Sequence, residues 1–384
     1  MINQGYASGL VKKRVLFVTG TRADFGKMKP LIQVTESSPN YEVHVAITGM
    51  HLLSTFGDTW REVTTTLNCQ NHLISNSADS PSQDVILSRT IESFGNLVRS
   101  IHFDLVVVHG DRVEALGSAL VGLLNNIPIA HVEGGEVSGT VDEMLRHATS
   151  KLSTYHLVAN NSARTRLLQM GESEESIRII GSPDLDVMAS SYLPSLEQVH
   201  SHYEIGSIEY GILIFHPNVT NPEETKNDLL ELVEFLRGTN KYFVVVYPNN
   251  DPGHLEILAA LKSVENANVR LLPSMRFEYF LTLLKFAKLI IGNSSAGIRE
   301  APFYGTPTIN IGTRQNNRSD LNQISNLVGA VAKVIEAEVD RLWDVRFEIS
   351  FEFGDGTSTE LFEGLLIQNY FQTLDIQKSF VNII

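Results

Sequence analysis

Short apolar runs recur along the chain and alternate with segments of helical periodicity. In the first half, runs rich in β-branched residues occupy 14–19, 41–47, 104–110, 127–133, 155–159 and 176–181. Amphipathic segments lie between them, for instance at 113–124 and 163–170. Continuous apolar strands separated by amphipathic helices are typical of a parallel sheet that is covered on both faces. The pattern therefore predicts a doubly wound α/β unit.

Between residues 184 and 208 the apolar runs stop, and the segment contains a proline and several serines. A second series of runs then follows, at 210–216, 242–248, 268–273, 287–293 and 306–312. We therefore predict two Rossmann-like domains, residues 1–190 and 191–360, and a helical segment, 361–384, that packs back on the first domain. Helical character itself begins at Ser358 and continues to Gln377. Ligands of such sheets bind at the carboxyl ends of the strands, which points to the cleft between the domains.

Composition narrows the class of protein without naming an activity. A chain of 384 residues, of which 43% are hydrophobic and 19% charged, fits two globular domains better than one. The formal net charge of −14 disfavours broad binding to nucleic acid or anionic membranes, although a local positive pocket can still hold an anionic ligand. Cys69 is the single cysteine, so no intramolecular disulfide forms. Because we find no signal-peptide core and no apolar stretch of roughly 20 residues, we expect a cytoplasmic protein.

Polar residues gather directly after the predicted strands. The first strand ends in TGTRADFG, where Gly20 permits a tight turn and Arg22 and Asp24 stand at the entrance of a helix. A helix N-terminus carries unpaired N–H groups and a partial positive charge, so this turn suits a phosphate. An ordinary capped turn with a surface arginine explains the same residues.

Three carboxylates follow neighbouring strands. Asp111 lies in HGDR, and Glu133 and Asp142 lie in HVEGGEVSGTVDEMLRH, which also carries Arg146 and His147 at helical spacing from Asp142. Each carboxylate alone could cap a helix or form an i,i+4 ion pair, but three independent caps explain the group poorly. Crowded, buried carboxylates acquire separated pKa values, as general acid–base chemistry requires. A metal site is the rival interpretation, although no HExxH spacing supports zinc.

The second half offers a complementary set of polar residues. His216 ends a strand in FHPN, and Asn293, Ser294 and Ser295 lie between a strand and a predicted helix. Hydroxyl groups and helix N–H groups at such a turn are suited to a diphosphate. Glu300 farther along that helix is a candidate for ribose hydroxyls, and Arg314 adds a cation near the next strand end. A structural histidine and a serine N-cap are the alternative.

Taken together, these motifs resemble the bacterial hydrolysing UDP-N-acetylglucosamine 2-epimerases of sialic acid synthesis, and the epimerase half of the bifunctional animal enzyme is similar. The resemblance rests on GTRADFGK, HGDR, HxEGGExSGTVDE…RH, GSPDLDVM, YPNND, SMRFEYF, GNSSAGIREAP and GTRQNNR, in this order. It implies a GT-B fold, in which two Rossmann-like domains face a central cleft. It also implies no redox cofactor, no required metal, a UDP-sugar substrate and a homodimer or homotetramer.

The resemblance further implies a reaction in two stages. UDP leaves C1 while the C2 proton is lost in an anti elimination, and water then adds to the 2-acetamidoglucal to give N-acetylmannosamine. The catalytic positions of the family fall on Asp111, Glu133, Asp142 and His216. Its UDP-binding positions fall on Arg22, Arg112, Ser294, Ser295, Glu300 and Arg314, to which the strand-end pattern adds Asp24, Arg146 and His147 as substrate-binding candidates. Whether Asp142 or Glu133 removes the C2 proton stays open, and HPNVTN at His216 departs from the HPVTT frequent in the family.

Several alternatives remain at this level. Within the family, the substrate could be a UDP-2,4-diacetamido-trideoxyhexose or a GDP-linked sugar used for legionaminic-type acids. A non-hydrolysing epimerase would return UDP-N-acetylmannosamine instead of the free sugar. A GT-B glycosyltransferase would share the fold and the UDP site, whereas a sugar-nucleotide sensor would leave the three carboxylates without a task.

Overall fold

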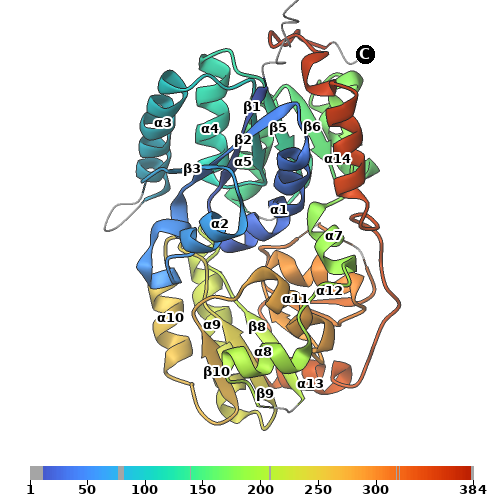
Figure 1. Ribbon diagram of the computed structural model, residues 1–384. Coiled ribbons are helices and arrows are strands. Elements are labelled where there is room, and N and C mark those ends of the chain that lie inside the picture. Colours follow the sequence, from blue (N-terminus) through green and yellow to red (C-terminus); the bar gives the residue numbers. More distant parts are fainter. Residues whose placement is uncertain are drawn as a thin grey trace, which may run out of the picture.

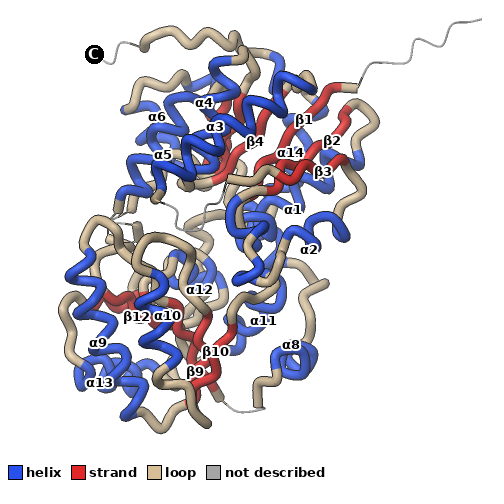
Figure 2. Tube along the Cα trace, turned by 90° about the vertical axis from the view of Figure 1, so that its left-hand side faces the viewer, coloured by secondary structure: helices blue, strands red, loops and turns tan. Residues whose placement is uncertain are grey.

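The computed structural model describes residues 12–76, 82–138, 140–206, 209–316, 318–319 and 321–381. Two parallel sheets lie one above the other, each with its own helices (Figures 1 and 2). The upper sheet has the order β3-β2-β1-β4-β5-β6-β7, with β1 (Lys13–Thr19), β2 (Tyr41–Ile47), β3 (Gln70–Leu73), β4 (Leu105–His109), β5 (Ile129–Val132), β6 (Tyr155–Val158) and β7 (Ile177–Ile179). The lower sheet has the order β10-β9-β8-β11-β12-β13, with β8 (Tyr210–Ile214), β9 (Tyr242–Val246), β10 (Val269–Leu272), β11 (Ile290–Gly292), β12 (Thr308–Ile311) and β13 (Ile324–Leu327).

Both sheets are therefore doubly wound, and the strand order of each reverses next to its first strand. The helices of the upper unit are α1 (Arg22–Ser37), α2 (Trp60–Thr66), α3 (Gln83–Ser100), α4 (Val113–Leu124), α5 (Val141–Leu152), α6 (Asn161–Gln169) and the returning α14 (Ser358–Ile367). The remaining helices are α7 (Pro183–Ala189), α8 (Leu196–Tyr203), α9 (Pro222–Gly238), α10 (His254–Lys262), α11 (Phe277–Phe286), α12 (Glu300–Phe303) and α13 (Ala332–Leu342). The predicted α/β fold with two Rossmann-like sheets is confirmed, and the reversal points are where such folds bind ligands.

Alternating side chains explain why the strands are apolar throughout. In β1, Val15 and Phe17 belong to a core shared with α1 and α14, whereas Leu16 and Val18 belong to a core on the other face, shared with α3 and α4. Successive residues of a strand point to opposite faces. A strand covered by helices on both faces therefore has no side chain that faces water, and apolar residues occupy its positions on both faces. The same alternation puts Ile212 and Leu213 of β8 into different cores.

The two strands that the apolar pattern did not reveal, β3 and β13, lie at the edges of their sheets. Their sequences, QNHL and ISNL, contain polar residues because an edge strand has only one neighbour and stays partly exposed. Every apolar run listed above contains a strand.

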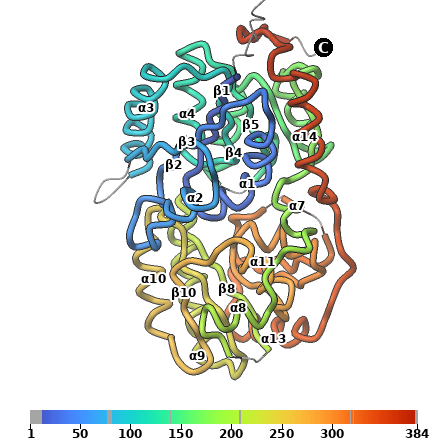
Figure 3. Tube along the Cα trace, in the orientation of Figure 1, coloured from blue at the N-terminus to red at the C-terminus, as the bar shows by residue number. Residues whose placement is uncertain are grey.

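The chain passes between the two units twice. The connection at 184–206 contains α7 and α8, and Leu185 and Met188 of α7 pack into a core of the lower unit. After α13 the chain runs back along the outside of the molecule to α14 on the upper unit (Figure 3). The helix expected to reach Gln377 ends at Ile367, because Asn369 adopts a left-handed conformation with φ 54°. Among the described residues, no helix is long and apolar enough to cross a membrane.

Candidate active site

The carboxyl ends of the central strands from both sheets face one cavity of about 330 Å³. Its walls come from the turns after β1, β4 and β5 in the upper unit and after β8, β9, β11 and β12 in the lower unit. Among the predicted site residues, its lining includes Arg22, Asp24, Asp111, Arg112, Glu133, Arg146, His216, Ser294, Ser295, Glu300 and Arg314. The structure thus brings together residues separated by almost three hundred positions in the sequence.

One histidine in this cavity stands between two carboxylates. The Nδ1 atom of His109 lies 2.9 Å from Oδ1 of Asp24, and its Nε2 atom lies 3.0 Å from Oε2 of Glu133. Burial disfavours the imidazolium form, but the charges of Glu133 and Asp24 outweigh burial and raise the pKa of His109 to about 10. His109 is therefore a cation at neutral pH, and the three residues form an alternating row of charges at the ends of α1, β4 and β5.

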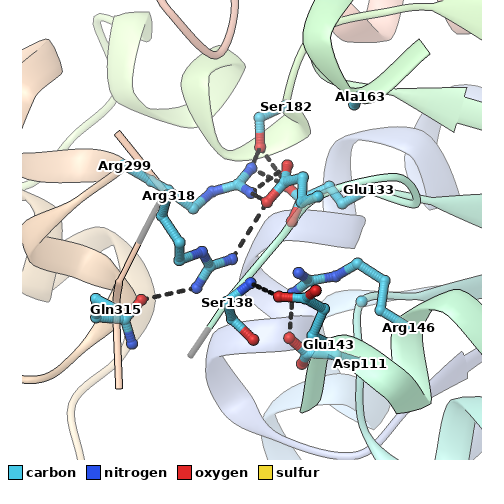
Figure 4. A network of polar contacts seen from close by, with 12 residues as sticks. Asp111, Glu133, Ser138, Glu143, Arg146, Ala163, Ser182, Arg299, Gln315 and Arg318 are labelled. Carbon is cyan, nitrogen blue, oxygen red and sulfur yellow. Dashed lines mark hydrogen bonds and ion pairs between the residues drawn. The ribbon is translucent and has the colours of Figure 1, made fainter. Parts of the chain in front are cut away.

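Glu133 adopts an unusual backbone conformation that presents its carboxylate to this row. Its φ angle of 62° is left-handed, a region that residues other than glycine seldom adopt and that often marks functional sites. Arg299, from the lower unit, places Nη2 2.6 Å from Oε1 of Glu133, and the hydroxyl of Ser182 donates to the same oxygen (Figure 4). Burial alone would raise the pKa of Glu133, but Arg299 and His109 hold it well below its usual range.

A second group of ion pairs joins the two units around Glu133. Nη1 of Arg299 donates to both oxygens of Glu136 at 2.6 Å, and Arg318 lies 3.2 Å from one of them. Lys27 of α1 lies 2.8 Å from Asp184. It also lies 2.8 Å from Glu300. All these side chains are largely buried, so removing any one partner leaves an uncompensated charge in the interface.

The other two predicted carboxylates also pair with arginines. Asp111 forms an ion pair with Arg146, which together with Arg318 outweighs burial and lowers the pKa of Asp111. Asp142 lies 3.2 Å from Arg314, and it lines a smaller cavity of about 50 Å³ that also touches Asp111. For Asp142 the balance is reversed: burial and the nearby charge of Asp111 outweigh Arg314, so its pKa is raised. Of the three carboxylates, Asp142 is therefore the one that binds a proton most readily.

His216 is held as a neutral ring. The backbone N–H of Asn249 donates to its Nδ1 at 3.0 Å, which leaves the ring proton on Nε2. Its backbone is fixed as well, because its N–H donates to the Asn293 side chain at 2.7 Å and its carbonyl accepts from that side chain at 2.9 Å. Burial and the charges of Arg314 and Arg112 hold the pKa of His216 well below its usual range.

The local structure around Ser294 and Ser295 differs from the prediction. The helix predicted after Ser295 is replaced by a single 3-10 turn, η4 (Ser295–Gly297), followed by the short α12. Ser294 caps this turn, since its Oγ accepts from the N–H of Ala296 at 3.3 Å. Glu300 begins α12 and pairs with Lys27.

Three predicted binding residues have partners within the protein. Nε of Arg22 lies 2.7 Å from Glu62, and its Nη1 donates to Ser274 of the lower unit at 3.0 Å, so it edges the cavity while bridging the units. His147 does not line the cavity, and its ring lies 3.7 Å from Glu143 on the same helix. Arg112 donates to the side chain of Asn250 at 3.0 Å.

Several polar and charged residues of the site were not among the predicted ones: Lys27, His109, Glu136, Ser182, Asp184, Arg299 and Arg318. Most stand inside motifs that the sequence displays, such as His109 in HGDR, Ser182 and Asp184 in GSPDLD, and Arg299 in GIREAP. For His109, its place two residues before the strand-end carboxylate Asp111 was the available signal.

Arginine side chains line the cavity, and among the described residues metal-ligating side chains do not cluster there. In the described parts of the chain, no group of three or more histidine, cysteine, aspartate or glutamate side chains is arranged to hold a metal ion. Arg112, Arg299, Arg314 and Arg318 all line the cavity and could neutralise a bound diphosphate.

The fold and the site define a GT-B protein whose interdomain cavity is lined by both arginines and carboxylates. A family profile described as UDP-N-acetylglucosamine 2-epimerase matches residues 33–366. The chain belongs to the UDP-N-acetylglucosamine 2-epimerase family.

Relatives in sequence agree with this assignment, and a solved structure shares the fold. A UDP-N-acetylglucosamine 2-epimerase of Neisseria meningitidis serogroup B is 44% identical over 97% of this chain and 99% of its own length. A UDP-N,N'-diacetylbacillosamine 2-epimerase (hydrolyzing) of Legionella pneumophila is 30% identical over 91% of this chain and 94% of its own length. The crystal structure of a UDP-GlcNAc 2-epimerase from Neisseria meningitidis bound to UDP-GlcNAc superposes with a TM-score of 0.76, at 22% identity, over 93% of this chain and all of that chain. The last comparison establishes the shared fold.

Proposed function

We propose that the protein is a hydrolysing UDP-N-acetylglucosamine 2-epimerase, which converts UDP-N-acetylglucosamine and water into N-acetylmannosamine and UDP, as sialic acid synthesis requires. The observation that carries this proposal is the set of three arginine–carboxylate pairs in the site: Asp111 with Arg146, Glu133 with Arg299, and Asp142 with Arg314. A glycosyltransferase or a sensor needs arginines for the diphosphate but has no use for three carboxylates beside them.

The two stages of the reaction divide the work between these groups. When the C1–O bond breaks, negative charge builds on UDP, and Arg112 and Arg314 in the cavity wall are available to neutralise it. Positive charge develops on the sugar ring at the same time, and an ionised carboxylate such as Glu133 stabilises it. His216, neutral and with its proton on Nε2, is available as a hydrogen-bond donor in the same cavity.

We propose Asp142 as the group that removes the C2 proton. A general base works best when its pKa is near the working pH, and the pKa of Asp142 is the one of the three that is raised. Asp111 and Glu133 are paired with arginines that lower their pKa values, so protons bind to them less readily. Within this scheme Asp111 and Glu133 shape the electrostatic field of the site.

The main alternative concerns the sugar. The Legionella pneumophila relative is named for UDP-N,N'-diacetylbacillosamine, and its identity extends over most of this chain. The Neisseria meningitidis relative has the higher identity and is named for UDP-N-acetylglucosamine, which is why we favour that substrate.

A product assay separates these proposals. The protein is incubated with UDP-N-acetylglucosamine, with UDP-N,N'-diacetylbacillosamine or with GDP-N-acetylglucosamine, and the products are resolved by anion-exchange chromatography and NMR. The proposal expects UDP and free N-acetylmannosamine from the first substrate, at a kcat/KM at least about tenfold above the others, which corresponds to about 1.4 kcal/mol of discrimination. UDP-N-acetylmannosamine as the product would identify a non-hydrolysing enzyme, and turnover of the diacetamido sugar alone would move the assignment to that substrate.

A further inference from the structure

Glu133 is surrounded by cations that come from both domains. One carboxylate oxygen, Oε2, faces Nε2 of His109 at 3.0 Å, on the upper unit. The other, Oε1, faces Nη2 of Arg299 at 2.6 Å, on the lower unit. The Glu133 side chain is 5% exposed and that of Arg299 is 2% exposed, so water does not compete for these contacts.

Ser182 completes the arrangement. Its hydroxyl donates to Oε1 of Glu133 and accepts from Nη2 of Arg299, so the three side chains close a small ring that Figure 4 shows from close by. Arg299 is itself fixed, because its Nη1 atom donates to both oxygens of Glu136. The guanidinium therefore has little freedom to leave Glu133 while the domains stay in contact.

We propose that His109 and Arg299 are positioning residues that hold Glu133 as a fixed anion, one from each domain, so that contact between the domains sets the charge of a carboxylate in the active site. We call Asp24, His109, Glu133, Ser182 and Arg299 the Glu133 clamp. It rests on the proposed function for what the anion does in the reaction. Both oxygens of Glu133 are occupied by donors, so Glu133 contributes its charge and does not carry protons.

The electrostatics of the clamp agree with the geometry. Burial lowers the pKa of His109, whereas the two flanking carboxylates raise it. The carboxylates have the larger combined effect, and the pKa rises to about 10. The charged groups that face Glu133 or His109 from other elements are Asp24 and Lys27 of α1, Asp111 after β4, Arg146 of α5, Asp184 of α7 and Arg299 before α12. Removing Arg299 takes away the cation that lowers the pKa of Glu133 most.

An experiment on His109 tests the clamp without any turnover. The full-length protein is labelled with ¹⁵N-histidine, and the ring nitrogens are followed by long-range ¹H–¹⁵N NMR between pH 6 and 9, with a His109→Gln variant to assign the signal. We expect both ring nitrogens of His109 to stay protonated up to pH 9 and to titrate at lower pH in Glu133→Gln. A His109 ring that titrates near its ordinary value of about 6.5 in the unaltered protein would overturn the clamp.

A second experiment tests Arg299 through chemical rescue. Arg299→Ala removes the guanidinium, and Arg341→Ala is the matched control, because Arg341 lies in the same domain but pairs with Glu338 at the surface. UDP binding is measured by calorimetry to establish that each variant is folded, and kcat and KM are measured between pH 5.5 and 9 with and without added guanidinium chloride at millimolar concentration.

We expect Arg299→Ala to lose about 10- to 100-fold in kcat, the usual effect of removing a group that orients a catalytic side chain, with a smaller change in KM. Its activity should also acquire a new decline toward acidic pH, because Glu133 becomes easier to protonate, and guanidinium should restore kcat. Arg299→Ala activity that matches Arg341→Ala at every pH, or a loss that guanidinium leaves untouched in a variant that still binds UDP, would overturn the role of Arg299. If the unaltered protein turns over none of the candidate sugar nucleotides, the proposed function fails, and the NMR result still decides whether the clamp exists.

Discussion

The Nη2 atom of Arg314, in the lower domain, lies 3.2 Å from Oδ2 of Asp142, in the upper domain. This pair joins the two domains across the small cavity that adjoins the main one. It places a cation suited to the diphosphate directly beside the carboxyl group that we propose as the base. The departure of UDP and the removal of the C2 proton are therefore expected to depend on the same interdomain contact.

Asp142→Asn tests the base directly. The amide keeps the size and most of the hydrogen-bonding capacity of the carboxylate but accepts no proton, so UDP should bind with little change while kcat falls about 10²- to 10⁴-fold. Calorimetric titration with UDP and a steady-state assay measure the two effects. Near-normal kcat would show that Asp142 is not the base and only lies in the first turn of α5, after the N-cap Thr140.

The pH dependence of Arg314→Gln follows from the charge of its partner. Asp142 must be ionised to accept a proton, so activity declines as the pH falls through its raised pKa. Arg314 lowers that pKa, and its removal raises it further, so the acidic limb of the kcat–pH profile should move to higher pH. A limb that stays in place, or moves to lower pH, would separate Asp142 from the rate-determining proton transfer.

Lys27 is the cation that joins α1 to two buried carboxylates of the interface. Lys27→Met leaves Asp184 and Glu300 with one cation fewer, which should lower the free energy of unfolding by about 3–5 kcal/mol. Lys27 helps to lower the pKa of Asp184 below its ordinary value of 3.8, so its contribution to stability is present at neutral pH and is lost only as the pH falls below that value, through the lowered pKa. Denaturant unfolding at pH 7 and pH 3 measures both effects, and Lys226→Met on the exposed face of α9 is the control. Equal stability of the two variants at pH 7 would contradict this role for Lys27.

Gly26 permits the close approach of the two domains. A Cβ atom built at Gly26 would lie 2.4 Å from Cβ of Phe277 on α11, far inside van der Waals contact. Gly26→Ala should therefore destabilise the protein by about 1–3 kcal/mol and raise KM for the sugar nucleotide, since the cavity lies between the same domains. Gly238→Ala, at the end of α9, is a matched control because a Cβ there meets nothing within 4 Å. Unfolding and kinetic assays of both variants that agree within error would contradict this account.

The architecture could be predicted because the central strands are buried on both faces. The run at 104–110 contains β4, and the segment 113–124 coincides with α4, since continuous apolar residues and a 3.6-residue period are strong local signals. β3 and β13 were not predicted, because edge strands do not need apolar residues on both faces. The end of α14 was not predicted correctly, because it depends on the left-handed conformation of Asn369, which asparagine adopts only in some settings.

Site residues could be predicted where they directly follow a strand. They could not be predicted where their role depends on a partner that is distant in the sequence. Asp111 and Glu133 could be singled out because the carboxyl ends of adjacent parallel strands meet at one edge of the sheet. Arg299 could not, because its partner Glu133 is 166 positions away in the sequence and belongs to the other domain. His147 was predicted as a site residue because it follows Arg146 directly in the sequence. In the structure its ring lies beside Glu143 on the same helix and does not line the cavity. The homodimer or homotetramer and the division of the chain at residues 190 and 360 stay predictions.

The fate of the C2 proton tests the central claim most directly. The protein is incubated with UDP-N-acetylglucosamine in deuterated water, and the sugar product is followed by proton NMR as it forms. An elimination followed by hydration predicts free UDP and N-acetylmannosamine that carries deuterium at C2 in every molecule. N-acetylmannosamine that retains the original hydrogen at C2, or release of UDP with N-acetylglucosamine as the sugar product, would contradict the account.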